Sequence, residues 1–207
     1  MLKRIIDFSI AFLALFLLSP IFLIVAYKVR KNLGSPIFFY QERPGLNGKL
    51  FKMIKFRSMK DAYDRDGEPL PDDQRITPFG KKLRSTSLDE MPQLLNVLKG
   101  DMSIVGPRPQ LPEFVVHYTS HQMRRHEVKP GMTGLAQVSG RNNLSWEEKF
   151  DLDVQYVERR SILLDFKIMF KTIKVMLKKE GIDAPDEIVG ARRFSGSESS
   201  QSKSSHH

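Results

Sequence analysis

The longest apolar run of the chain covers residues 5–27 and is interrupted by Asp7, Ser9 and the Ser19-Pro20 step. A transmembrane helix needs about 20 predominantly apolar residues, so this run is long enough to cross a bilayer. A cleaved signal peptide fits less well, because the run is too long and no small-residue cleavage site follows it. The pattern therefore predicts an N-terminal helix that enters the membrane.

The flanking charges and Pro20 indicate how this helix meets the membrane. Basic residues lie on both sides of the run and draw both ends to the cytoplasmic face: Lys3 and Arg4 before it, Lys28, Arg30 and Lys31 after it. Pro20 removes one backbone hydrogen bond near the middle, and the Ser19 hydroxyl can bond the carbonyl left free. The sequence favours a re-entrant helix over residues 1–31, broken at Ser19 and Pro20. An ordinary single-pass anchor remains the alternative.

Two short runs with β-strand character follow, at residues 36–40 and 50–56. Between them, residues 43–48 contain Pro-Gly and Asn-Gly steps, which are typical of tight turns. We therefore expect a β-hairpin. Alternation in the second run places apolar residues on both sides, so Lys55 near its end can be a solvated edge residue.

Three later segments have helical patterns. Residues 113–128 combine apolar side chains with a basic face that we expect to be exposed near lipid headgroups, and this face consists of His117, His121, Arg124, Arg125 and His126. Ser145 and Glu148 form a capping box for the next helix. Residues 162–179 carry an apolar stripe and a lysine stripe, a pattern that suits a helix lying along the membrane surface. A plain surface helix is the alternative.

Adjacent carboxylates, Asp89 and Glu90, lie at the centre of the chain. They precede an apolar run that ends at Lys99-Gly100, a usual helix stop. The pair should therefore open a helix, capped either at about Asp89 or by Ser87 in a capping box with Glu90. In both registers Asp89 lies against the positive end of the helix dipole, where a phosphate can also bind.

Arginines flank this acid pair in the sequence. Arg84 precedes it, and Arg108 lies between Pro107 and Pro109, whose fixed φ angles restrict the loop before any ligand arrives. A guanidinium held there can grip a phosphate or a base edge. A carboxylate can attack phosphorus and form an acyl-phosphate. Together with a membrane helix, these residues point to transfer of a phosphorylated group to or from a lipid.

Composition narrows the choice of partner. The 207-residue chain has a net charge of +9, which favours phosphorylated substrates or anionic lipid headgroups. No nucleic-acid-binding motif is present, so nucleic acid is not expected. The chain has no cysteine, which excludes a disulfide framework and thiolate metal sites. Residues 191–207, Ser-rich and ending in two histidines, are interpreted as a disordered tail or tag remnant.

Several blocks of the sequence resemble one known family. Ser-Leu-Asp-Glu at residues 87–90, Gln-Leu-Leu-Asn-Val-Leu-Lys-Gly-Asp-Met-Ser at 93–103 and Val-Gly-Pro-Arg-Pro at 105–109 are similar to the bacterial sugar transferases, the monotopic phosphoglycosyl transferases. Lys-Phe-Arg-Ser-Met at 55–59 and the glycine-rich block at 130–142 resemble the same family. The resemblance extends from Lys3 to about Leu177 and implies its small, catalytic-core form.

The resemblance carries expectations about the fold and its location. It implies an α+β fold that is mostly helical, with a re-entrant helix over residues 1–31 and a catalytic domain over residues 32–190. Amphipathic helices would lie parallel to the membrane around the active site. The protein would act at the cytoplasmic face of the bacterial inner membrane.

The resemblance also implies a reaction. The substrates would be a UDP-sugar and polyprenyl phosphate. Asp89 would be the nucleophile, expelling UMP, and Glu90 would help to hold Mg2+ beside Asp89 or orient the acceptor. Arg108, in the Pro107-Arg108-Pro109 loop, would meet the nucleotide, and the residues expected to meet phosphates are Lys55, Arg84 and Arg141. Two alternatives remain open: a lipid phosphatase and a non-enzymatic membrane adaptor.

Overall fold

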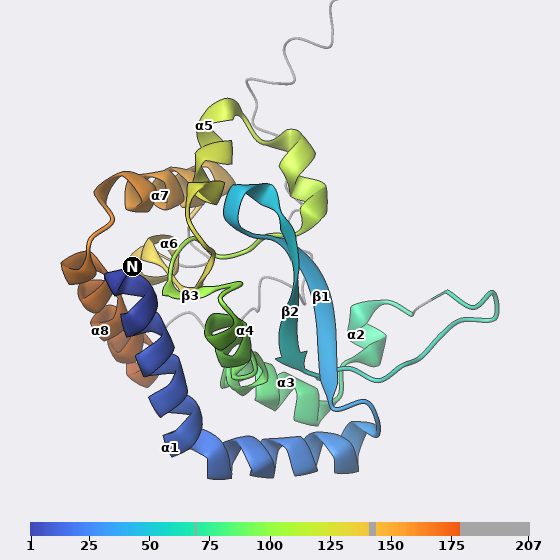
Figure 1. The fold of residues 1–207 in the computed structure, drawn as a ribbon. Helices are drawn as coiled ribbons and strands as arrows, with labels where there is room; N and C mark the ends of the chain where they lie inside the picture. Colours follow the sequence, from blue (N-terminus) through green and yellow to red (C-terminus); the bar gives the residue numbers. More distant parts are fainter. Residues whose placement is uncertain (69, 141–143, 179–207) are drawn as a thin grey trace, which may run out of the picture.

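The computed structural model describes residues 1–68, 70–140 and 144–178, and these residues form a mostly helical α+β fold (Figure 1). The helices are α1 (Leu2–Leu33), α2 (Asp72–Arg75), α3 (Pro78–Ser85), α4 (Gln93–Lys99), α5 (Ser120–Met123), α6 (Leu135–Ser139), α7 (Trp146–Arg159) and α8 (Ile162–Lys178). The strands are β1 (Phe38–Pro44), β2 (Leu50–Phe56), β3 (Ser103–Val105) and β4 (Gly131–Thr133), and the 3₁₀ turns are η1 (Leu46–Gly48), η2 (Leu88–Glu90), η3 (Pro112–His117) and η4 (Arg124–Glu127).

The apolar run forms α1, a continuous helix that is bent into two arms (Figure 1). Pro20 lies inside it and has no N–H to donate to the Phe16 carbonyl. The Ser19 hydroxyl donates to this carbonyl instead, at 2.8 Å. The hydrogen bond expected of Ser19 is confirmed, and the expected break takes the form of a bend because the backbone stays helical on both sides.

Both arms of α1 contribute to the core. One arm packs Ala11 into an apolar cluster with Met53, Leu94, Val97 and Met102, and the other packs Val25 and Val29 into a cluster with Phe56, Leu83 and Met91. Elsewhere α1 exposes apolar side chains, with Phe16, Leu17 and Leu23 each more than 60% exposed. By length and composition, α1 is apolar enough to cross a membrane.

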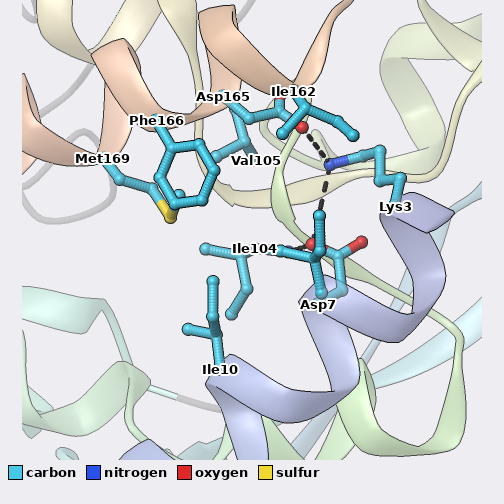
Figure 2. Close-up of a pocket in the computed structure, with 10 residues that line it drawn as sticks. Lys3, Asp7, Ile10, Ile104, Val105, Ile162, Asp165, Phe166 and Met169 are labelled. Carbon is cyan, nitrogen blue, oxygen red and sulfur yellow. Dashed lines mark hydrogen bonds and ion pairs between the residues drawn. The ribbon is translucent and has the colours of Figure 1, made fainter.

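Polar contacts hold the first turns of α1 (Figure 2). The Lys3 ammonium lies 2.7 Å from Asp165 on α8 and 3.6 Å from Asp7 on its own helix. Asp7 accepts hydrogen bonds from the Ser103 hydroxyl at 2.7 Å and from the Ile104 N–H at 3.2 Å. Since a buried carboxylate is costly unless it is paired, these contacts specify where α1 lies against β3.

Hydrogen bonds from two arginines connect the two ends of α1 to the rest of the domain. Arg4 donates to the Val97 and Leu98 carbonyls, at the C-terminal end of α4. At the other end of α1, Arg57 donates to the carbonyls of Leu33 and Ser35. The two ends of α1 therefore lie against one domain.

Two strand pairs hold the segments that surround the acid pair. β1 and β2 form the predicted antiparallel hairpin, with Phe38 opposite Phe56. β3 and β4 form a parallel pair, with Ser103 opposite Gly131, and β3 was not predicted from the sequence. A Cβ on Gly131 would lie 2.1 Å from the Gly106 nitrogen, so the close contact of these two backbones requires glycine.

The predicted continuous helix over residues 113–128 is wrong, because the segment forms η3, α5 and η4. Thr119 interrupts it by capping α5: its hydroxyl accepts from the Gln122 N–H while the Gln122 side chain accepts from the Thr119 N–H. His117 and His121 are exposed as expected. Arg125 and His126, expected on the same exposed face, are only 2% and 6% exposed.

The predicted capping box of Ser145 and Glu148 is confirmed at the start of α7. α8 has the predicted apolar face, on which Leu163, Phe166 and Phe170 are each more than half exposed. The domain boundary at residue 190 and the tail over residues 191–207 lie outside the described residues.

Asn96 joins α4 to β2 and generates a stability prediction. It is fully buried, its side-chain oxygen accepts from the Ile54 N–H at 3.0 Å, and its amide nitrogen donates to the Lys52 carbonyl at 2.8 Å. Asn96→Ala should lower the free energy of unfolding by about 2–5 kcal/mol, because it leaves two backbone groups unpaired. Denaturant unfolding of detergent-solubilised protein measures this loss. The exposed Asn32→Ala is the control, and equal stability of the two variants would contradict the prediction.

Candidate active site

The acid pair lies in a 3₁₀ turn ahead of the helix. Asp89 and Glu90 belong to η2, whereas α4 begins at Gln93. Both predicted cap registers are wrong. Asp89 lies inside η2, and Pro92 precedes the first residue of α4. Ser87 has a left-handed backbone with φ of 54° and makes no side-chain cap hydrogen bond. Pro92 lacks the N–H that would continue an α-helical ladder back to Leu88, and the chain makes shorter i→i+3 bonds here instead.

Glu90 lies between two cations from distant parts of the chain. One Arg108 nitrogen lies 2.7 Å from Glu90 Oε1, and the other lies 3.4 Å from Oε2. The Lys55 ammonium, on β2, is 3.3 Å from Oε1. The planar guanidinium of Arg108 and the ammonium of Lys55 thus contact the same carboxylate.

The charges around Glu90 determine its protonation state. Burial alone would raise the pKa of Glu90, but the positive charges of Arg108 and Lys55 outweigh it and hold the pKa well below its usual range. Glu90 therefore stays ionised at neutral pH. A guanidinium and an ammonium that already face an anion are donors of the kind that bind phosphate.

Arg84 lies on α3, the helix that precedes η2 and contacts it. Its Nε donates to the Ser58 hydroxyl at 2.8 Å, and its buried Nη1 has no hydrogen-bond partner among the described residues. The Ser87 N–H bonds to the Arg84 carbonyl at 2.9 Å, so the backbone of Arg84 leads directly into η2. A buried guanidinium nitrogen with spare donor capacity is suited to an anionic ligand.

The structure thus brings together most of the residues that the sequence singled out. Lys55 and Arg108 contact Glu90, Asp89 is buried in the same turn with 6% exposure, and the Arg84 carbonyl bonds to Ser87, the residue before that turn. Arg141 lies outside the described residues, so its expected role stays a prediction.

The Pro107-Arg108-Pro109 loop is fastened through its backbone carbonyls. Pro107 accepts from the Gly131 N–H at 2.9 Å, and Arg108 accepts from Arg125 at 2.7 Å. The Pro109 carbonyl accepts a longer bond from Arg43, at 3.4 Å. We did not predict Arg43 or Arg125 as neighbours of this loop. Both lie in basic or turn-like segments whose local pattern resembles an exposed surface.

Hard oxygen ligands for a metal ion are present at the acid pair. In the part of the chain that the structure describes, no group of three or more His, Cys, Asp or Glu side chains could hold a metal ion. Mg2+ commonly takes one or two carboxylates and completes its shell with water and substrate phosphates. Asp89 and Glu90 fit this smaller requirement.

The described residues thus combine a helix that is apolar enough to cross a membrane with a cluster in which Lys55 and Arg108 contact Glu90, next to Asp89. The family model of the bacterial sugar transferases matches residues 1–179, and the chain belongs to this family. The family predicted from the sequence motifs is therefore confirmed, as is the prediction of a transferase.

Three relatives illustrate the range of the family. The chain is 52% identical to an uncharacterized sugar transferase, EpsL of Bacillus subtilis, over 95% of this chain and 96% of that protein. It is 39% identical to the undecaprenyl-phosphate galactose phosphotransferase of Salmonella typhimurium, over 87% of this chain and 41% of that protein. It is 43% identical to the UDP-glucose:undecaprenyl-phosphate glucose-1-phosphate transferase of Klebsiella pneumoniae, over 83% of this chain and 39% of that protein.

His126, next to the arginine that holds the loop, generates a pH prediction. Burial and the neighbouring charge of Arg125 lower the pKa of His126 from 6.5 to about 4. The unfolded chain therefore binds a proton between pH 6.5 and 4 that the folded chain does not bind. Stability should fall as the pH falls through this window, by on the order of 3 kcal/mol from His126 alone.

Denaturant unfolding at pH 7 and pH 4.5 measures this effect in detergent-solubilised protein. The His126→Gln variant, which is neutral at both pH values, should lose less stability than the wild type. The exposed His121→Gln is the control and should behave like the wild type. Equal losses for wild type and His126→Gln would refute the lowered pKa of His126.

Proposed function

We propose that the protein moves a sugar-1-phosphate from a UDP-sugar to polyprenyl phosphate, giving polyprenyl diphosphate sugar and UMP. The observation that carries the proposal is the contact of Lys55 and Arg108 with Glu90, next to the buried Asp89. This cluster lies in a domain tied to an apolar helix, where a soluble donor and a lipid acceptor can both reach it. The names of two relatives, the galactose phosphotransferase of Salmonella typhimurium and the glucose-1-phosphate transferase of Klebsiella pneumoniae, specify undecaprenyl phosphate as acceptor and support the same reaction.

Asp89 is the proposed nucleophile. A carboxylate oxygen of Asp89 forms a bond to the phosphorus that bears the sugar, and the bond from this phosphorus to UMP breaks. An oxygen of the lipid phosphate then attacks the same phosphorus, and the bond to Asp89 breaks. The carboxylate is regenerated, and no oxidant or reductant is consumed.

The surrounding cations act on the charge of the phosphates. Arg108 and Lys55 already face a carboxylate, so a diphosphate arriving beside Glu90 meets donors that need little reorganisation. The spare Nη1 of Arg84 is a further donor for a phosphoryl oxygen. Glu90 keeps Arg108 and Lys55 in place between turnovers, since its own charge persists at neutral pH.

A divalent cation completes this proposal. Asp89 and Glu90 are the residues that would hold Mg2+, and the ion would neutralise charge on the phosphates of the donor. The two carboxylates are adjacent in η2. Of the two carboxylate oxygens of Glu90, Oε1 makes the short contacts with both Arg108 and Lys55.

The bend of α1 supports a re-entrant position in the cytoplasmic leaflet. Arg4 at one end and Leu33 at the other contact the same polar domain. A polar domain cannot lie in the hydrocarbon core, so both ends of α1 are expected on one face of the membrane. The exposed apolar faces of α1 and α8 would then contact acyl chains, while the lysines of α8 would meet anionic headgroups.

Intact-protein mass spectrometry tests the proposed covalent step. Purified protein is incubated with Mg2+ and a panel of UDP-sugars without lipid acceptor. The wild type should gain the mass of one phosphosugar with the correct donor, and Asp89→Asn should gain none. With polyprenyl phosphate present, UMP formation by Asp89→Asn should fall by roughly 10³-fold or more. Asp72→Asn, the same change at an exposed carboxylate of α2, is the control.

Each of the other outcomes would indicate a different function for this protein. Release of free sugar phosphate without acceptor would favour a lipid phosphatase. UMP formation without any adduct would favour direct transfer, and no UMP with any donor would favour a non-enzymatic adaptor.

Cysteine labelling tests the topology, because the chain has no cysteine of its own. Leu2→Cys and Lys31→Cys place single thiols at exposed positions near the two ends of α1. In intact cells, a membrane-impermeant maleimide should label neither variant, and in inverted membrane vesicles it should label both. Lys49→Cys, in the turn of the hairpin, is the cytoplasmic reference. Labelling of one end from outside the cell would establish a single-pass anchor.

A further inference from the structure

The backbone of the Pro107-Arg108-Pro109 loop has few N–H groups through which the rest of the protein can hold it in place. Its two prolines have no N–H, so the backbone of these three residues can be held mainly through its carbonyls. Each of the three carbonyls accepts a hydrogen bond, and the shortest of them, at 2.7 Å, comes from Arg125 to Arg108 itself. The backbone from which the Arg108 side chain extends is thus held by a second arginine.

Arg125 is built into the interior as a rigid donor. It is 2% exposed, and its guanidinium lies over the rings of Tyr118 and Phe150, at 5.5 and 5.1 Å from their centroids. Its Nη1 donates to the Tyr118 hydroxyl at 2.8 Å, and its Nη2 lies 2.6 Å from Asp153 Oδ2. Its Nε donates to the same carboxylate oxygen at 3.2 Å.

Stability alone does not account for this arrangement. Burying an ion pair costs desolvation energy that is often no smaller than the attraction gained, and an apolar residue of similar volume can serve the core as well. An apolar residue would, however, leave the Arg108 carbonyl without its donor. The feature that only a guanidinium supplies here is simultaneous contact with a carboxylate, a hydroxyl and a loop carbonyl.

We propose that Arg125, oriented by Asp153, is a positioning residue that fixes the Arg108 backbone so that the Arg108 side chain meets Glu90 and the donor phosphates. The proposal rests on the function proposed above. The contacts run in series from Asp153 to Arg125, to the carbonyl of Arg108, and through the Arg108 side chain to Glu90. Arg125 itself touches no substrate.

Replacement of Arg125 by lysine should disturb the alignment of Arg108 more than substrate binding. A lysine ammonium keeps the charge but cannot bridge the three acceptors with a planar fork. Since a misplacement of about 1 Å in a catalytic group can cost about 10²-fold in rate, we expect Arg125→Lys to lower kcat by about 10- to 100-fold. KM for the UDP-sugar should change less than about threefold, because the remaining phosphate contacts persist.

The experiment combines kinetics with a matched control and a double-mutant cycle. UMP formation is measured for wild type, Arg125→Lys, Arg108→Lys and the double variant. Arg124→Lys is the control: Arg124 is the neighbouring arginine, paired with the exposed Glu127 and Glu158, and should stay within twofold of wild type. In the Arg108→Lys background, Arg125→Lys should cost less than about threefold, because the side chain that it positions has already been changed.

Amide hydrogen exchange supplies a readout that does not depend on activity. Peptides that contain Gly106 and Arg108 should exchange faster in Arg125→Lys than in wild type, while peptides of α1 and β1 should be unchanged. Asp153→Asn keeps the shape of the side chain and should give the same local acceleration, so it serves if Arg125→Lys does not fold.

The outcomes separate this inference from the proposed function. Equal losses of kcat in the wild-type and Arg108→Lys backgrounds, or exchange that accelerates throughout the protein, would reduce Arg125 to a structural role and overturn the inference. Absence of UMP from wild type with every donor would overturn the proposed function. In that case the exchange at residues 106–108 still decides whether Arg125 holds the loop.

Discussion

The missing N–H of Pro20 is the constraint on which the arrangement of this protein depends. A straight helix of 32 residues would be about 48 Å long, too long to follow the side of a small domain. Because Pro20 cannot continue the backbone ladder and Ser19 satisfies the free carbonyl, α1 bends, and both of its arms pack against the domain. The most apolar segment of the chain thus becomes part of the core while its outer side stays exposed.

Electrostatics explain how the candidate site holds Arg108 and Lys55 close to each other. Two cations close to each other would repel, and Glu90 removes this repulsion by accepting from both Arg108 and Lys55. The pKa of Glu90 stays low because these charges outweigh its burial. A phosphate that enters the cluster would replace or share the role of this carboxylate, so the positive groups need not move far to receive it.

Local patterns predicted the parts of the fold that local interactions decide. Residues 5–27 predicted α1 by apolar length, and the Pro-Gly and Asn-Gly steps predicted the β1–β2 hairpin. The start of α4 was missed because Pro92 interrupts the α-helical ladder and the acid pair forms the 3₁₀ turn η2 before it. The left-handed backbone of Ser87, which precedes this turn, is not revealed by the sequence pattern. Lys55 was singled out by the family motifs, whereas Arg108 was singled out first by its two flanking prolines; their contacts with Glu90 appear only in the structure.

The buried polar groups were the hardest part to predict. Arg125 follows another arginine and precedes a histidine, a local composition typical of an exposed face. Its burial depends on Asp153, which lies 28 residues later on α7, and on two aromatic rings from different elements. No spacing rule on one helix can reveal a partner on another, so this kind of contact becomes visible only in three dimensions.

The apolar helix α1 and the candidate site are held by the same elements. Arg4 on α1 binds the carbonyls at the end of α4, the helix that follows Asp89 and Glu90. Asp7 binds β3, the strand that leads to Arg108. Glu90 and Arg108, which meet across the site, are therefore each one short element away from a contact with α1. Displacement of α1 would disturb both partners of this ion pair, so the position of the site relative to α1 follows from the same contacts that shape it.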